Sequence, residues 1–170
     1  RRKWAAHSLT GIQAGSRWLL VSYILLLLFF TILGRRSLDY YRYNFNIGYS
    51  FRDAFYNGTP ATIKLIAVNI VIFIPVGFWG ILGAKRFGFL TAPLLGVMLT
   101  ASIELLQLLL RNGTCEIDDL ISNTFGTLLG ILFALLFRPH VQYLFCILTH
   151  RPTPKDPRWE GYEIELMEST

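Results

Sequence analysis

Residues 18–34 read WLLVSYILLLLFFTILG, and this apolar run decides the class of fold. About 20 apolar residues in a helix are needed to cross the interior of a bilayer. The run holds no charged residue, and it lies between Arg17 on one side and Arg35 and Arg36 on the other. Its apolar core is long for a signal peptide and no small-residue cleavage site follows, so the run predicts a retained membrane-spanning helix.

Three further apolar blocks are long enough to span a membrane. We expect these spans at residues 61–83, 89–110 and 120–137. Arg138 and Pro139 are expected to end the last span. The short apolar stretch 141–148 that follows is either an interfacial helix or an extension of that span. The sequence therefore predicts an all-α protein, a polytopic membrane bundle of four transmembrane helices.

Composition agrees with a membrane protein. Of the 170 residues, 53% are hydrophobic and only 16% are charged, against about 25% charged in soluble domains. The mean hydropathy is +0.45. We divide the chain into an N-terminal segment (1–17), a transmembrane domain (18–148) and a polar C-terminal tail (149–170). The net charge of +5 favours an anionic partner, and we expect a membrane surface, not nucleic acid, because the basic residues flank the apolar blocks.

The distribution of Lys and Arg predicts an orientation. With the N-terminus inside, ten of the 16 basic residues fall on the inner side and six on the outer side. Because inner loops are enriched in Lys and Arg, we expect both termini in the cytoplasm. The aromatic loop 35–60 would then face outward. Its rings are interpreted either as an interfacial belt or as a lid over a sugar or lipid headgroup.

Polar residues inside the apolar blocks are the candidate site residues. An ionisable group in a span is costly unless it is paired or neutral, and it often marks a site. Glu104 is the clearest case, and Gln107 lies three positions later on the same side of the helix. Asn69 lies inside the second span, and Asp119 and Asn123 share a face of the fourth.

Small residues on that same face predict close helix packing. Asp119, Asn123, Gly126 and Gly130 recur at intervals of four, three and four. The two glycines form a GxxxG pair, which lets two helix backbones approach closely.

Depth estimates bring the polar residues together. A rise of about 1.5 Å per residue puts Glu104, Gln107, Asn69 and Asn123 in the outer half of the membrane. We therefore predict a polar cluster open to the outside. The acidic residues at its mouth would be Asp118 and Asp119, with Glu116 nearby. The alternatives are structural: one of the aspartates caps the fourth helix, and the amides tie helices together.

Three stretches together resemble the VanZ-like family of bacterial membrane proteins. They are NIVIFIPVG at 69–77, ELLQ at 104–107 and RNGTCEIDDLISNTFGTLLG at 111–130. The resemblance covers residues 44–137. The family often has an Asn-Leu-x-Pro-Phe-like element after its first helix, and here Asn44-Phe-Asn-Ile-Gly48 takes that place without the proline.

The resemblance implies a multi-pass protein of the bacterial plasma membrane that acts in the cell envelope. The family's namesake is associated with lowered susceptibility to teicoplanin-type glycopeptides. The expected partners are membrane lipids or a lipid-linked cell-wall precursor. No cofactor is expected, and the sequence holds no metal motif, since Cys115 and Cys146 are predicted on opposite sides of the membrane and no CxxC is present.

Two function hypotheses remain open. In the first, an outward pocket binds a lipid or lipid-linked sugar headgroup. Its ligand-binding residues would be Asn69, Gln107, Arg111, Asp118, Asp119 and Asn123. In the second, the protein is an intramembrane enzyme that modifies such a headgroup. Glu104 would then act as general acid or base, and Asp118 and Asp119 would hold a divalent cation.

Overall fold

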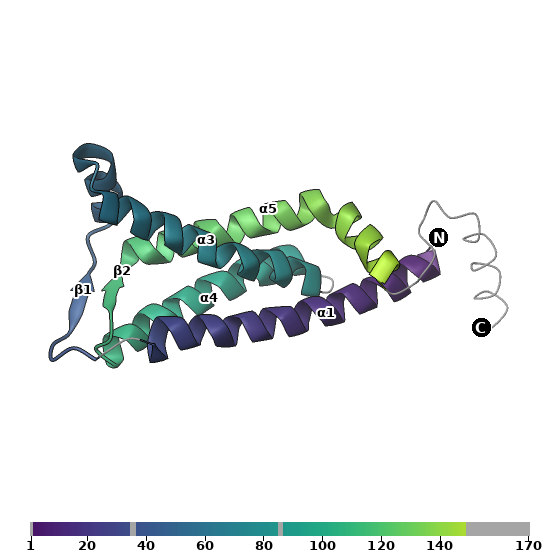
Figure 1. The fold of residues 1–170 in the computed structure, drawn as a ribbon, viewed down its shortest axis with the longest axis horizontal. Coiled ribbons are helices and arrows are strands. Elements are labelled where there is room, and N and C mark those ends of the chain that lie inside the picture. The colour runs from purple at the N-terminus through teal and green to yellow at the C-terminus, as the bar shows by residue number, and fades with distance from the viewer. Residues whose placement is uncertain (1, 35–36, 85–86, 149–170) are drawn as a thin grey trace.

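The computed structural model describes residues 2–34, 37–84 and 87–148. Its elements in chain order are α1 (Arg2–Leu28), a π-helical turn η1 (Phe29–Leu33), β1 (Arg42–Asn44), α2 (Tyr49–Arg52), a second π-helical turn η2 (Asp53–Asn57), α3 (Pro60–Gly83), α4 (Gly88–Leu109), β2 (Thr114–Glu116) and α5 (Ile117–Leu148). Figure 1 shows the long helices side by side, with both strands at one end, here named the strand end. The predicted tail 149–170 lies outside the described residues.

Four helices in the described part of the chain are long and apolar enough to cross a membrane. They cover Gly11–Leu33, Pro60–Gly83, Gly88–Leu109 and Ile117–Leu144. The all-α prediction is confirmed, and the second and third spans begin within one residue of the predicted positions. The first helix extends far beyond the predicted start, because α1 already begins at Arg2.

The predicted end of the fourth span at Arg138 and Pro139 is wrong. Helix α5 continues through Pro139 to Leu148, so the stretch 141–148 extends the fourth helix. Proline removes one amide donor, but its fixed φ angle is compatible with a helix, so a long helix accepts it with a bend. In Figure 1 the last part of α5 turns toward α1.

Helices α3 and α5 meet backbone to backbone. A Cβ atom added to Gly126 would collide with the carbonyl oxygen of Ile70, and one added to Gly130 would collide with that of Ile74. From the other side, Gly77 of α3 lies as closely against the backbone of α5. The close approach predicted from the GxxxG pair is therefore confirmed, with α3 as the partner helix.

Helix α1 is fastened to α3 away from the strand end. Three side chains of α1 donate hydrogen bonds to backbone carbonyl oxygens of α3 and the residue after it: Tyr23 Oη to Ile72 at 2.7 Å, Arg17 Nε to Gly83 at 2.7 Å and Gln13 Nε2 to Ala84 at 3.0 Å. Toward the strands the two helices separate, as Figure 1 shows. This divergence leaves space between them at the strand end.

The loop between α1 and α3 is partly structured. Strand β1 pairs in parallel with β2, with Arg42 opposite Thr114 and Asn44 opposite Glu116. The turn after β1 contains Gly48 in the left-handed region, at φ 77°. Most aromatic rings of this loop are exposed.

The glycine contact predicts a large packing effect from one methyl group. Gly126→Ala would force α3 and α5 apart, and we expect it to destabilise the fold by about 1–3 kcal/mol, typical of an overpacked core. Gly15→Ala is the matched control, because nothing lies within 4 Å of a Cβ atom there. The midpoint of thermal unfolding in detergent measures both. A Gly126→Ala protein as stable as wild type would contradict the close contact.

Candidate functional site

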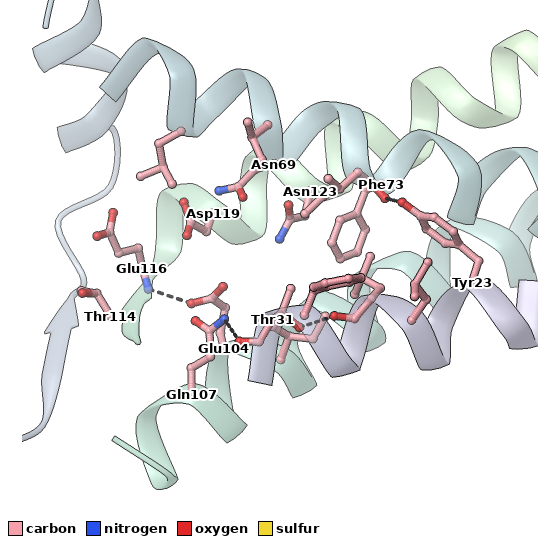
Figure 2. Close-up of a pocket in the computed structure, with 17 residues that line it drawn as sticks. Tyr23, Thr31, Asn69, Phe73, Glu104, Gln107, Thr114, Glu116, Asp119 and Asn123 are labelled. Carbon is pink, nitrogen blue, oxygen red and sulfur yellow. Dashed lines mark hydrogen bonds between the residues drawn. The ribbon is translucent and has the colours of Figure 1, made fainter. Parts of the chain in front are cut away.

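A cavity of about 390 Å³ lies at the strand end of the bundle (Figure 2). Its apolar wall consists of Leu26, Leu27, Phe30, Leu65, Val68, Ile72, Phe73 and Ile103. Its polar lining consists of Tyr23, Thr31, Asn69, Glu104, Gln107, Thr114, Glu116, Asp119 and Asn123. The residues come from all four long helices, η1 and β2, so the cavity exists only in the assembled fold.

Five of the seven predicted site residues line this cavity. They are Asn69 from α3, Glu104 and Gln107 from α4, and Asp119 and Asn123 from α5. Figure 2 shows Asn69 and Asn123 on one side, with Glu104 and Gln107 facing them. The structure places the other two, Arg111 and Asp118, outside the lining.

The backbone at the end of β2 holds the Glu104 side chain in place. Its side chain is 6% exposed, and its Oε2 accepts a hydrogen bond of 3.0 Å from the backbone N–H of Glu116. One turn away, Gln107 Nε2 donates to the carbonyl oxygen of Thr31 at 3.3 Å. A buried carboxyl group in such a position can accept hydrogen bonds from a ligand or transfer a proton.

The two asparagines present polar atoms that the protein does not satisfy. Asn123 Nδ2 donates to Thr100 Oγ1 at 2.7 Å. Within the described part of the chain, no hydrogen-bond partner reaches Asn123 Oδ1 or Asn69 Nδ2, although these residues are only 4% and 9% exposed. Buried polar atoms are nearly always paired, with protein or with a bound molecule. These two atoms therefore point to an occupant of the cavity, either water or a ligand.

Asp118 holds the loop rather than lining the cavity. Its two carboxylate oxygens accept hydrogen bonds from the backbone N–H groups of Gly48, at 2.6 Å, and Ser50, at 2.7 Å. The residue is 2% exposed. Its carboxylate therefore caps the start of α2.

Arg111 also contacts the loop. Its Nη2 donates to Tyr41 Oη at 3.0 Å, and the guanidinium lies 4.2 Å from the centroid of the same ring. This is the geometry of a cation–π contact. Arg111 thus fixes the aromatic loop against the end of α4.

The cavity has an apolar opening on the flank between α1 and α3. The lining residues Leu26 of α1 and Phe30 of η1 are 51% and 63% exposed, and Leu65 and Val68 of α3 are 39% and 44% exposed. These side chains bound the cavity and also face outward. In a membrane, such a flank faces lipid chains, so the opening leads sideways into the bilayer.

The electrostatic character of the cavity is acidic. Among the described residues that line it, none is Lys, Arg or His, and three are carboxylic acids: Glu104, Glu116 and Asp119. Burial first, and then the charges of these three residues, raise the pKa of the adjacent Cys115 thiol. Across the described residues, no three His, Cys, Asp or Glu side chains group closely enough to hold a metal ion. This geometry gives no support to a divalent cation held by Asp118 and Asp119.

Sequence reasoning missed the contribution of the first helix. Tyr23, Leu27 and Thr31 line the cavity at intervals of four residues, which places them on one face of a helix. The available signal was the polar side chains of Tyr23 and Thr31, which lie on the same face of this mostly apolar run. Thr114 was not predictable, because its position depends on the pairing of β1 with β2.

Comparison with known proteins decides the family. The sequence profile of the VanZ/LLP1 family matches residues 18–138. The chain belongs to the VanZ/LLP1 family. It is similar to Protein VanZ of Enterococcus faecium, with 28% identity over 131 residues, which cover 75% of this chain and 78% of that protein. No solved structure matches the chain. Together with the four apolar helices, the family assignment makes this a multi-pass membrane protein.

The VanZ/LLP1 match contains the whole cavity. All lining residues fall between Tyr23 and Asn123, within the matched residues 18–138.

Labelling of Cys115 can report the charge of Glu104. A raised pKa leaves less reactive thiolate at a given pH. Glu104→Gln removes one of the charges that raise this pKa, so we expect faster reaction with an uncharged maleimide at a pH below the thiol pKa. The measurement uses a Cys146→Ser background, and Asp39→Asn, an exposed acid outside the cavity, is the control. An unchanged rate would contradict an influence of the Glu104 carboxyl group on this thiol.

Hydrogen exchange can test the loop anchor. Asp118→Asn replaces a charged double acceptor by a neutral side chain with one acceptor. We expect exchange at the amides of Gly48 and Ser50 to accelerate by about tenfold or more, as the loss of a charge-assisted hydrogen bond implies. Asp39→Asn should leave these amides unchanged. Equal protection in Asp118→Asn and wild type would show that the carboxylate does not hold the loop.

Proposed function

We propose that this protein binds the headgroup of a membrane lipid or of a lipid-linked cell-wall precursor in the cavity, and thereby lowers susceptibility to glycopeptide antibiotics. The observation that carries the proposal is the combination of a buried polar end with an apolar opening between α1 and α3. A lipid has the same two parts. Its headgroup would meet the polar residues, while its chains would remain in the bilayer beside Leu26 and Val68.

The buried amides support binding. Asn69 and Asn123 each present a polar atom without a partner in the described structure, and a bound headgroup would supply the missing hydrogen bonds. The volume of about 390 Å³ lies within the ~300–1,000 Å³ range of small-molecule sites. It accommodates a headgroup, while the chains of a diacyl lipid would extend through the opening.

The orientation belongs to the same proposal. With both termini in the cytoplasm, the strand end lies at the outer face of the plasma membrane. The cavity would then take lipids from the outer leaflet, where cell-wall precursors are used. The exposed aromatic rings of the loop, which include Tyr40, Tyr43 and Phe55, would lie at the headgroup level, where amphipathic rings are favoured.

The family supports the link to glycopeptides. The chain resembles Protein VanZ over most of its length, and the family's namesake is associated with lowered susceptibility to teicoplanin-type glycopeptides. A protein that holds an envelope lipid can alter what such an antibiotic meets at the membrane surface. This route needs binding alone and no chemical step.

Two valine substitutions on α3 test the proposal. Val68 lines the cavity, whereas Val71, three residues later, is 60% exposed and lies outside the lining. We expect Val68→Trp to fill the opening, to reduce the lipid that co-purifies with the protein and to return the teicoplanin susceptibility of an expressing host to that of the empty vector. Val71→Trp should retain both properties.

Mass spectrometry of extracted lipid and growth inhibition in teicoplanin provide the two measurements. Equal lipid retention and equal resistance in the two tryptophan variants, at equal protein levels, would exclude the cavity as the binding site.

A further inference from the structure

The charge of the cavity narrows the class of headgroup. Glu104 and Asp119 both face the space between α3 and α4 in Figure 2, and no described lining residue is basic. Water screens charges poorly in such a buried space, so opposite charges attract and like charges repel more strongly than at a surface. A phosphate placed beside these carboxyl groups would be repelled, and a cation would be attracted.

The unsatisfied acceptor points in the same direction. Asn123 Oδ1 lies at the cavity without a hydrogen-bond donor in the described structure, and its residue is 4% exposed. An ammonium group carries three N–H donors and no acceptor. It therefore matches a lining that contains the carboxyl groups of Glu104 and Asp119 and this amide oxygen, because a carboxyl oxygen can accept a second hydrogen bond beside one that it already accepts. The remaining donor, Asn69 Nδ2, is left for an oxygen atom of the same ligand.

A bare metal ion fits these residues less well than an organic cation. Across the described residues, no three His, Cys, Asp or Glu side chains converge closely enough to coordinate one. The apolar wall, which includes Leu27, Ile72 and Phe73, would also have no role in holding an ion. It would pack against the methylene groups of an organic ligand.

We infer that the cavity takes a protonated primary amine carried on an apolar chain, which enters between α1 and α3. This inference rests on the proposed function and narrows the polar headgroup to a cationic one. A phosphate on the same ligand would lie farther from the carboxyl groups than the amine does, near the opening of the cavity. The source of the amine is either a bilayer lipid with an amino headgroup or a single-chain amphiphile that partitions into the membrane.

The experiment compares ligands with and without a protonated amine. The purified full chain in maltoside micelles is titrated with phosphatidylethanolamine, its N-acetylated form and phosphatidylglycerol of the same acyl chains, and bound lipid is counted by native mass spectrometry. Dodecylamine and dodecanol form a second pair without phosphate. We expect each amine to bind about tenfold more tightly than its counterpart without an ammonium group, equivalent to ~1.4 kcal/mol.

Isosteric variants connect the preference to the cavity. Glu104→Gln combined with Asp119→Asn keeps side-chain size and removes both carboxylates, so the amine preference should disappear. Asp39→Asn makes the same kind of change at an exposed position and should retain it. An unchanged elution profile in gel filtration confirms that the double variant is folded. If the double variant does not fold, Glu104→Gln alone is tested, and we expect it to reduce the amine preference.

The outcomes separate the two proposals. If phosphatidylethanolamine and dodecylamine both show the preference, the amine is recognised from either source, and if only one does, that source is the ligand class. Equal binding of the amines and of their counterparts without an ammonium group overturns the amine inference but leaves lipid binding standing. Binding that Val68→Trp does not reduce overturns the proposed function itself.

Discussion

The contact between the backbones of α3 and α5 is the constraint on which the rest of the structure depends. It requires glycine on both helices, because a Cβ atom at Gly77 or Gly126 would collide with the opposite backbone. Gly126 meets Ile70, and Asn69 and Asn123 lie next to these positions on their helices. The close packing of these two helices thus brings two amide side chains to the same cavity inside an apolar bundle.

A second constraint shapes the space beside those amides. Within the described residues, Gln13, Arg17 and Tyr23 of α1 donate hydrogen bonds to main-chain oxygens of α3 and the residue after it, and the bond from Tyr23 is the one nearest the strands. Beyond it the helices separate, and the gap is filled by neither strand. The cavity therefore lies between α1 and α3, which diverge beyond the hydrogen bond of Tyr23, and residues of α4 and α5 line its other sides.

The spans were predictable because hydropathy and length report directly on the bilayer. The convergence of Asn69, Glu104, Gln107, Asp119 and Asn123 was also predictable, because helical periodicity defines a face and rise defines a depth. The direction of Asp118 was not. Adjacent residues on a helix point about 100° apart, so only one of two neighbouring aspartates can face the cavity. Asp118 contacts the loop because β1 pairs with β2 and so brings the loop close to the start of α5. Strands of three residues leave no periodic signal in the sequence, so this pairing could not be predicted. The continuation of α5 through Pro139 was one of two alternatives for residues 141–148, and a stop at Pro139 was expected because proline usually ends helices in soluble proteins, whereas transmembrane helices tolerate it.

The two neighbouring aspartates contact different parts of the molecule, so the start of α5 connects the loop with the cavity. Asp118 grips the turn at Gly48 and Ser50, while Asp119 faces the cavity. A single peptide unit therefore separates the residue that holds the aromatic loop from a residue that lines the cavity. Because both side chains belong to the first turn of α5, the contact with the loop and this part of the cavity wall depend on the position of the same helical turn.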